Sequence, residues 1–125
     1  MSHPLPSGFQ YSGIACGIKN SGKPDLAMIV GDQPVVAAGV YTQNVVHAAS
    51  IDWNRARTPG AQIRGVVINS GNANACTGEQ GVADNEEFAR LAATELGSEP
   101  DQILVLSTGI IGEPLPMDKI SVGTQ

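Results

Sequence analysis

Two short apolar runs separated by a helical segment most tightly constrain how this chain folds. Residues 65–69 are rich in β-branched side chains and predict a buried strand, and residues 103–106 predict another. Between the runs, an apolar stripe at helical spacing is formed by Phe88, Leu91, Ala92 and Leu96. A helix that joins two buried strands implies a right-handed crossover, so the two strands are expected to be parallel neighbours.

The ends of this helix carry residues that suit helix termini. Thr77 and Gln80 have the spacing of a capping box, in which two side chains satisfy free backbone donors, so the helix is expected to begin near Thr77. Gly97 can adopt the left-handed conformation that ends many helices. Residues 118–120 resemble the start of a further helix close to the end of the sequence.

The first half of the chain predicts shorter strands broken by turns. Strands are expected over residues 11–18, 26–30 and 35–41. Turns are expected at residues 20–25 and 32–34, so the last two strands should form a β-hairpin with a polar loop. Residues 45–53 fit either a strand or a helix.

Length and charge limit what the chain can be. Its 125 residues suit one domain or part of a larger one. The formal net charge is -5 and the Lys and Arg residues form no basic run, which argues against nucleic acid or an anionic membrane as a partner. No segment has the apolar length needed to span a bilayer, and residues 1–4 do not open a secretory signal, so a cytoplasmic protein is expected.

The cysteines and histidines form no recognisable metal or redox motif. Cys16 and Cys76 lack the spacing of a CxxC pair, and in a cytoplasmic chain both thiols are expected to be reduced and partly buried. His3 and His47 lie far apart in the sequence without a ligand pattern, so no metal site is expected.

Residues 69–78, rich in asparagine and glycine, form the first segment that could carry chemistry. Small residues allow a close backbone approach, and amide side chains beside a helix N-terminus could hold a carboxylate, a phosphate or another loop. A rigid loop whose Asn side chains bond its own backbone fits the pattern equally well. Cys76 is not favoured as a nucleophile, because no histidine lies near it in the sequence.

The second segment is formed by Ser107, Thr108 and Gly109, which are expected to follow the second apolar strand as a turn. Such a turn can direct a hydroxyl and a backbone N–H at one point, the arrangement that stabilises the oxyanion of acyl transfer. A turn in which Thr108 caps its own backbone is the competing interpretation. Neither a GxSxG elbow nor an HExxH motif occurs, so the chain offers an oxyanion stabiliser without an evident nucleophile.

Residues 65–78 strongly resemble a signature of the ornithine acetyltransferase family, the bifunctional glutamate/ornithine N-acetyltransferases of arginine biosynthesis. Residues 107–112 and the following residues 114–117 resemble the family's second signature, and residues 13–30 resemble its beginning. The resemblance extends over nearly the whole chain. It identifies residues 1–125 as the N-terminal portion of the family's α chain, truncated before the site of self-cleavage.

The resemblance implies an α/β fold, in which helices flank a mixed sheet, with a logic related to the N-terminal nucleophile hydrolases. The family's precursor cuts itself at an Ala-Thr bond into α and β chains that assemble as α2β2. The threonine freed at the start of the β chain takes the acetyl group from N-acetylornithine and passes it to glutamate, with its own α-amine as the base. Some members also accept acetyl-CoA as a substrate, and no cofactor is implied.

By position, Thr108 and Gly109 match the family's oxyanion pair, with a hydroxyl from Thr108 and a backbone N–H from Gly109. The family's cleavage motif does not occur here, because the one Ala-Thr pair, at residues 93–94, lies inside the expected helix. The nucleophile and the substrate-binding residues are therefore expected beyond Gln125. This chain alone is expected to be inactive.

Two alternatives stay open at this point. The lack of a nucleophile fits a non-enzymatic small-molecule binding or regulatory module on the same scaffold. The order of elements fits a nucleotide-binding α/β domain, although neither GxGxxG nor Gly-Lys-Ser/Thr occurs. A fragment of an enzyme also predicts an exposed sheet edge and apolar surface, and hence poor solubility or self-association when it is expressed alone.

Overall fold

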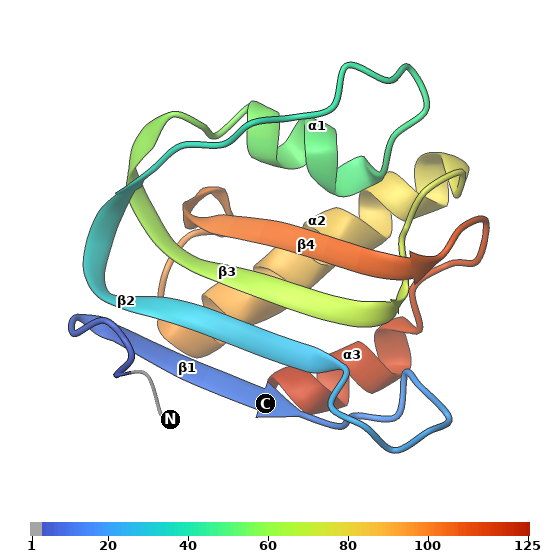
Figure 1. Cartoon of the computed structure of the whole chain (residues 1–125), viewed down its shortest axis with the longest axis horizontal. Coiled ribbons are helices and arrows are strands. Elements are labelled where there is room, and N and C mark those ends of the chain that lie inside the picture. The colour runs from blue at the N-terminus through green and yellow to red at the C-terminus, as the bar shows by residue number, and fades with distance from the viewer. Residues whose placement is uncertain (1–3) are drawn as a thin grey trace.

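The computed structural model describes residues 4–125 and places four strands in one sheet with helices around it (Figure 1). In chain order the elements are β1 (Phe9–Ile14), β2 (Leu26–Ala37), α1 (Ala49–Arg55), β3 (Gly60–Asn72), α2 (Gly78–Leu96), the 3-10 helix η1 (Pro100–Gln102), β4 (Ile103–Ile110) and α3 (Met117–Thr124). None of the helices in this part of the chain combines the length and apolar character that a membrane crossing requires.

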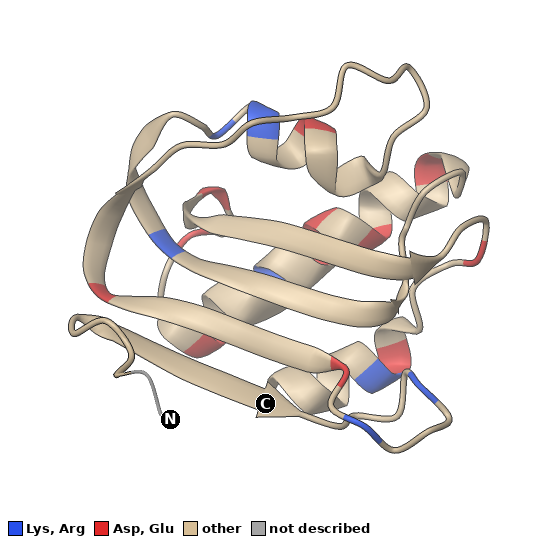
Figure 2. Cartoon of the chain, in the orientation of Figure 1, with Lys and Arg blue, Asp and Glu red and all other residues tan. Residues whose placement is uncertain are grey.

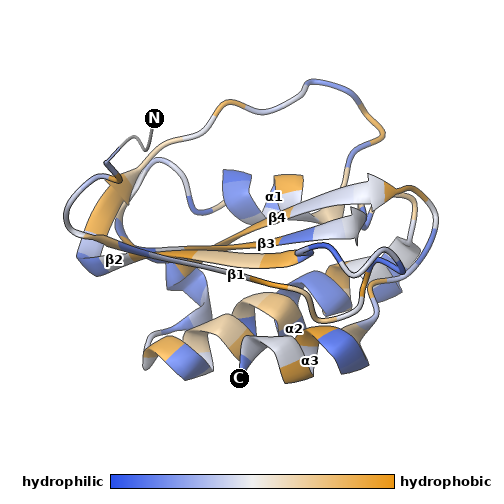
Figure 3. Ribbon diagram, turned by 60° about the horizontal axis from the view of Figure 1, so that its bottom comes forward, coloured by the Kyte–Doolittle hydropathy of each residue, from blue (hydrophilic) through white to orange (hydrophobic). Residues whose placement is uncertain are grey.

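The sheet is mixed, and its strands lie in the order β1, β2, β3, β4. The β1–β2 and β2–β3 pairs are antiparallel, whereas β3 and β4 are parallel. The helix α2 connects the parallel pair, as the two apolar runs predicted. Figure 3 shows α2 and α3 on the same face of the sheet, so the predicted α/β fold with a mixed sheet and flanking helices is confirmed.

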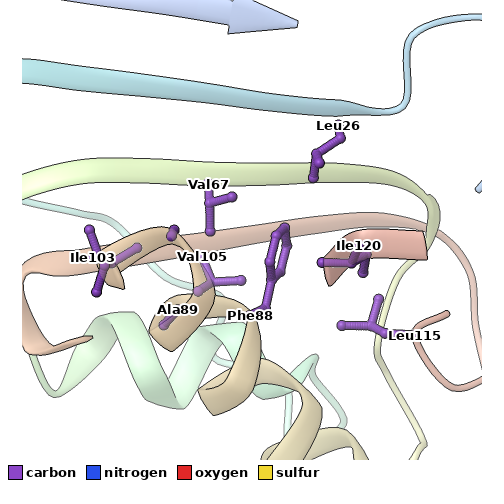
Figure 4. Packing of buried hydrophobic residues seen from close by; sticks show 10 residues of the cluster. Leu26, Val67, Phe88, Ala89, Ile103, Val105, Leu115 and Ile120 are labelled. Atoms are coloured by element: carbon purple, nitrogen blue, oxygen red, sulfur yellow. The ribbon is translucent and has the colours of Figure 1, made fainter. Parts of the chain in front are cut away.

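The core lies between the sheet and these two helices. Side chains along β3 are alternately buried and partly exposed, because every second residue of a strand points to the same face. Phe88 of α2 is fully buried in one cluster with Val67 of β3 and Val105 of β4, and Ile120 of α3 belongs to the same cluster (Figure 4). This cluster holds together two strands and two helices from the second half of the chain.

The opposite face of the sheet is covered less completely. Leu106 is 47% exposed and Ile110 is 56% exposed, although both are apolar residues of β4. Apolar side chains at this level of exposure on a sheet edge agree with the uncovered apolar surface expected from the sequence.

The two short strands predicted on either side of Pro34 do not form a hairpin. They belong to the single strand β2, which continues through Pro34 to Ala37. Pairing between β2 and β3 is irregular from Val30 to Val35, and this irregularity accommodates a proline, which has no N–H to donate to the ladder. The observed hairpin joins β1 to β2 and contains the predicted turn at residues 20–25.

Several predicted boundaries are close to the observed ones. The strand expected over residues 11–18 is β1, which ends earlier, at Ile14. The ambiguous segment 45–53 contains the start of α1, and residues 118–120 lie in α3. Gly97 ends α2 in the left-handed conformation, with φ of 59° and ψ of 39°, as predicted.

The predicted capping box at the start of α2 is not formed. The helix begins after Thr77, but the Thr77 hydroxyl donates to Asn74 Oδ1 (2.7 Å). The amide of Gln80 donates to Asp84 Oδ1 (2.8 Å) instead of reaching back to the backbone. Each of the two side chains is bonded to another side chain, so the start of α2 has no side-chain cap.

Candidate functional site

The two segments that could carry chemistry lie side by side at the ends of β3 and β4. Ser70 pairs with Thr108, and Gly71 pairs with Gly109, in continuous parallel register. The predicted Ser-Thr-Gly turn is wrong, because pairing with β3 keeps these residues in β4 as far as Ile110 and the chain turns only afterwards. A hydroxyl residue followed by a glycine thus occupies the same position near the end of each strand.

Gly71 and Gly109 approach each other so closely that only glycine avoids a steric clash at position 109. Their φ angles are 128° and 136°, in a region that residues with a side chain rarely adopt. A Cβ atom on Gly109 would collide with the carbonyl group of Gly71 and would lie 2.6 Å from the backbone nitrogen of Asn72. Only a glycine fits at position 109, and it leaves the backbone there exposed.

The backbone of β4 presents its donors alternately to β3 and to the outer edge of the sheet. At the outer edge, the Val105 N–H donates to Asn54 Oδ1 of α1 (2.9 Å), and the Val105 carbonyl accepts from Asn54 Nδ2 (2.7 Å). On the inner side, the Ile110 carbonyl accepts from the Ala73 N–H (2.9 Å). This alternation directs the N–H of Gly109, like that of Val105, toward the outer edge.

The side chain of Thr108 lies on the face away from the core. Val105 is buried against α2, so Thr108, at the opposite parity in the strand, points to the other face beside its partner Ser70. Thr108 is exposed, and its hydroxyl makes no hydrogen bond to any residue between 4 and 125. A hydroxyl and an N–H from consecutive residues are therefore available at one corner of the sheet, which we call the donor corner.

The strand that carries the donor corner, β4, contains no charged residue. No Lys, Arg, Asp or Glu belongs to β4, and Figure 2 shows the charged residues on the helices, the loops and other strands. A negative charge that develops at the donor corner would be stabilised by fixed neutral dipoles, which is how an oxyanion hole acts.

The asparagine side chains between β3 and α2 hold the loop itself. Asn69 Nδ2 donates to the Asn72 carbonyl (2.9 Å), and Asn74 Nδ2 donates to the Gly81 carbonyl (2.8 Å). Asn69 and Asn74 are fully buried, and Asn74 has a positive φ of 52°. These contacts favour the interpretation of residues 69–78 as a rigid structural loop.

The same loop fixes the chain that follows β4. Asn72 Nδ2 donates to the Pro114 carbonyl (2.9 Å), and the Gly112 N–H donates to the Ala75 carbonyl (2.8 Å). The two segments that resemble family signatures, residues 65–78 and 107–117, are thus hydrogen-bonded to each other. The asparagine loop determines the direction in which the chain leaves the donor corner.

Both ring nitrogens of His47 have hydrogen-bond partners, so His47 is not an evident base for acyl transfer. His47 Nε2 lies 2.9 Å from both carboxylate oxygens of Asp52, and His47 Nδ1 lies 2.9 Å from the Asn44 carbonyl. Both ring nitrogens therefore face acceptors, and the hydrogen bond to Asp52 raises the pKa of His47. His3 lies outside the described residues. Across residues 4–125, no cluster of three His, Cys, Asp or Glu side chains could hold a metal ion.

Both cysteines are free thiols. Cys16 is partly buried, as predicted, and its burial together with the nearby Asp25 carboxylate raises the pKa of its thiol. Cys76 is exposed rather than partly buried, and it lies in the loop before α2 with a positive φ of 57°.

Two features of the donor corner were missed in the sequence. One is the pairing of the two glycines. Near the ends of both predicted parallel strands a hydroxyl residue is followed by a glycine, and this shared order could have predicted the pairing. The other is Asp25, a buried residue whose carboxylate accepts hydrogen bonds from the N–H groups of Cys16 and Lys19 (2.8 Å each). Nothing in the local pattern around Asp25 distinguishes it from a turn residue.

Comparison with known sequences connects these features to one family. The model of the ArgJ family matches residues 10–125. The arginine biosynthesis bifunctional protein ArgJ of Rhodopirellula baltica is 48% identical over 124 residues, which cover 99% of this chain. ArgJ of Symbiobacterium thermophilum is 52% identical over 120 residues, which cover 94% of this chain. This chain spans 30% of the length of each of these relatives.

Two solved structures have the same fold. An ornithine acetyltransferase of Mycobacterium tuberculosis in complex with ornithine superposes with a TM-score of 0.91 at 42% identity, over 95% of this chain and 65% of that one. ArgJ of Bacillus halodurans superposes with a TM-score of 0.89 at 37% identity, over 94% of this chain and 62% of that one. Because the family match extends over nearly all of its residues, this chain belongs to the ArgJ family.

Proposed function

We propose that this chain is the N-terminal portion of an enzyme that transfers an acetyl group from N-acetylornithine to glutamate in arginine biosynthesis. Membership of the ArgJ family supports the proposal, as does the ornithine in the structure of the M. tuberculosis relative. Residues 1–125 belong to the α chain, and the nucleophilic threonine lies outside them. The chain acts in the cytoplasm together with the β chain of its precursor, in an α2β2 assembly, and is inactive alone.

The reaction proceeds in two halves. The threonine hydroxyl attacks the acetyl carbonyl of N-acetylornithine while the α-amine of that threonine takes the proton. The tetrahedral intermediate collapses by breaking the amide C–N bond, and the departing ornithine amine receives the proton. The amine of glutamate then attacks the acetyl-threonine ester and loses a proton to the α-amine of the threonine. The ester C–O bond breaks, the threonine oxygen receives that proton, and N-acetylglutamate is released.

Thr108 and Gly109 stabilise the oxyanion that forms in each half. The Thr108 hydroxyl and the Gly109 N–H donate to the carbonyl oxygen as it gains negative charge. The observation that carries this role is that both donors, from consecutive exposed residues, lie at the donor corner. Donors that are fixed before the reaction stabilise the developing charge without any cost of reorganisation.

A chimeric enzyme tests this role. Residues 1–125 replace the corresponding part of full-length Thermus thermophilus ArgJ, which is 47% identical over 124 residues. Acetyl transfer from N-acetylornithine to glutamate gives kcat and KM. Thr108→Ala should lower kcat about 100- to 1000-fold, because one oxyanion donor is lost. Thr108→Ser should keep most of the activity, because the hydroxyl remains.

Thr94→Ala is the matched control, because Thr94 is exposed on α2 and its hydroxyl only donates to the Arg90 carbonyl of the same helix (2.9 Å). This variant should keep the kcat of the unmodified chimera. An active chimera in which Thr108→Ala keeps full kcat would contradict the oxyanion role. A folded chimera that transfers no acetyl group would contradict the proposed function as a whole.

A further inference from the structure

Asp25 is a buried carboxylate that connects a distant turn to the donor corner. Only 3% of the residue is exposed. Its Oδ1 accepts from the Cys16 N–H and its Oδ2 accepts from the Lys19 N–H, both at 2.8 Å. The two bonds close residues 16–19 into a tight turn. Because both acceptor oxygens of the carboxylate are used, the group is fixed in orientation as well as in position.

This turn rests on Gly71. A Cβ atom on Gly71 would lie 2.6 Å from Ile18 Cγ2, so the side chain of Ile18 packs directly against the backbone of that glycine. Lys119 Nζ of α3 donates to the Gly17 carbonyl (2.7 Å) and holds the same turn from the other side. Gly71 in turn contacts Gly109 across the parallel pair. The position of the turn therefore limits where the backbone of Gly109 can lie.

The main chain of Asp25 provides a second connection. Its carbonyl accepts from the N–H of Ser70 (2.9 Å), and Ser70 is the register partner of Thr108. Its N–H donates to the Ile14 carbonyl of β1 (2.9 Å). Asp25 is thus bonded to the residue beside Thr108 by its backbone and linked to the residue beside Gly109 through its side chain.

We propose that Asp25 is a positioning residue for acyl transfer, whose carboxylate holds the 16–19 turn against Gly71 and so sets the direction of the Thr108 hydroxyl and the Gly109 N–H. The inference rests on the oxyanion role proposed above. An asparagine cannot replace the carboxylate, because an amide accepts only through Oδ1 and its Nδ2 would face an N–H.

The electrostatics of the site agree with an ionised carboxylate. Burial alone raises the pKa of Asp25, but the hydrogen bonds from the Lys19 and Cys16 backbone outweigh it, and the net pKa is lowered. Hydrogen bonds to an ionised acceptor are shorter and stronger than neutral ones. The turn is therefore held firmly throughout the neutral pH range.

The chimeric enzyme also tests this inference. Asp25→Asn should lower kcat about 10-fold while KM stays within about twofold, because displaced donors weaken the transition state more than substrate binding. The kcat is referred to active sites counted by the burst of acetyl-enzyme, so that unfolded molecules do not contribute. Asp32→Asn is the matched control, since Asp32 is exposed on β2 and its carboxylate accepts one long bond from Gln10 Nε2 (3.2 Å) within residues 4–125. This variant should keep full kcat.

A double variant separates positioning from general stability. In the Thr108→Ala background, Asp25→Asn should cost no more than about 3-fold in kcat, because one of the two positioned donors is already gone. An equal loss in both backgrounds would overturn the inference, because Asp25 would then affect the reaction independently of the Thr108 hydroxyl. Retention of full kcat by Asp25→Asn, with a large loss in Thr108→Ala, would overturn the positioning role alone. Retention in both would overturn the oxyanion role as well.

A second variant covers the case in which Asp25→Asn does not fold. Ile18→Ala removes the side-chain contact with Gly71 and leaves both bonds of the Asp25 carboxylate in place. It should lower kcat about 3-fold with little change in KM, because Gly71 loses its support. An Ile18→Ala chimera with unchanged kcat would show that the turn does not act on the donor corner, and the inference would fall.

Discussion

Gly109 of β4 lies so close to Gly71 of β3 that a Cβ atom on Gly109 would collide with the carbonyl group of Gly71. The two residues are register partners in the parallel pair, and both have a positive φ. Two strands with ordinary side chains could not approach in this way. The close contact leaves the backbone of Gly109 open at the outer edge, where a reacting group can approach it.

Gly109→Ala should be strongly destabilising. The new side chain would meet the Gly71 backbone and would also force an alanine into a φ of 136°. We expect a loss of about 3 kcal/mol in the free energy of unfolding, from the combined backbone strain and overlap. Urea denaturation of this chain, followed by circular dichroism, measures the loss.

Gly112→Ala is the control for this experiment. Gly112 also has a positive φ, of 87°, but nothing lies within 4 Å of its added Cβ. It should lose only about 1 kcal/mol, the cost of the left-handed conformation alone. Equal losses in the two variants would show that the contact between Gly71 and Gly109 is not tight in solution.

Asp25 should make the free energy of unfolding depend on pH in the acidic range. Burial opposes ionisation, but the bonds from the Lys19 and Cys16 N–H groups prevail, so the pKa of Asp25 is lower in the folded chain than in the unfolded chain. A lowered pKa contributes stability above the unfolded value of about 4, and that contribution is lost as the pH falls through the folded value. Asp25→Asn should therefore be clearly less stable than wild type at pH 7, with a difference that narrows below about pH 4.

Urea denaturation at a series of pH values from neutral to strongly acidic measures this difference. Asp32→Asn, at an exposed carboxylate on β2, provides the comparison for the simple loss of one negative charge. A stability difference for Asp25→Asn that stayed constant over the whole range would mean that the carboxylate is not the group responsible.

Ser107→Ala should make the chain more stable. The Ser107 hydroxyl is buried without a hydrogen-bond partner among residues 4–125, and so is Oδ1 of Asn69, its register partner. A buried hydroxyl without a partner costs stability, so its removal should raise the free energy of unfolding by about 1 kcal/mol. Thr58→Ala removes a hydroxyl that donates to the Asn54 carbonyl (2.9 Å) and also bonds the Tyr41 hydroxyl (2.5 Å), so it should instead lower the free energy of unfolding by about 1 to 2 kcal/mol. Thermal denaturation of both variants measures these changes. A change of the opposite sign in either variant would contradict the corresponding expectation.

The isolated chain should self-associate through the exposed face of the sheet. Its accessible surface is 7303 Å², against about 6,300 Å² for a compact monomer of 12.9 kDa. Leu106 on this face is 47% exposed, and burial of such side chains favours association. Size-exclusion chromatography should show an apparent mass that rises with concentration.

Leu106→Thr should shift this elution toward the monomer, because it reduces the apolar surface of the exposed face. Val122→Thr should not, because Val122 is exposed on α3, which covers the other face of the sheet. A wild-type chain that elutes as a monomer at every concentration would contradict the expectation.

The β3–α2–β4 unit was predictable because its signals are local. The apolar stripe with Phe88 and the left-handed Gly97 are properties of a single helix, and a helix between two apolar strands leaves one common handedness. The continuity of β2 through Pro34 was not predictable, because it depends on pairing with β3, far along the chain. Local turn chemistry favoured a break, and the pairing of the sheet prevailed over it.

The donor corner, too, contains some residues that the local sequence predicts and others that it does not. Thr108 and Gly109 were identified through a resemblance carried by neighbouring residues in the sequence. Asp25 is linked to them through the 16–19 turn, which its own carboxylate closes, and this relationship leaves no local pattern. Gly71 is linked to them through strand register, which shows only when the ends of the two strands are compared. The Thr77 cap failed for a related reason, because the Thr77 hydroxyl donates to the side-chain Oδ1 of the left-handed Asn74 (2.7 Å) instead of accepting from the helix backbone.

The helix α1 has only 7 residues, or about 10 Å of length, and its Asn54 occupies both outer backbone groups of Val105 while β4 continues to Ile110. The edge of the sheet is thus partly sealed and partly accessible. A longer α1 would protect more of the edge from unwanted strand pairing but would restrict access to the donor corner, and a shorter one would do the reverse. The length of α1 therefore controls access to the donor corner independently of Thr108 and Gly109.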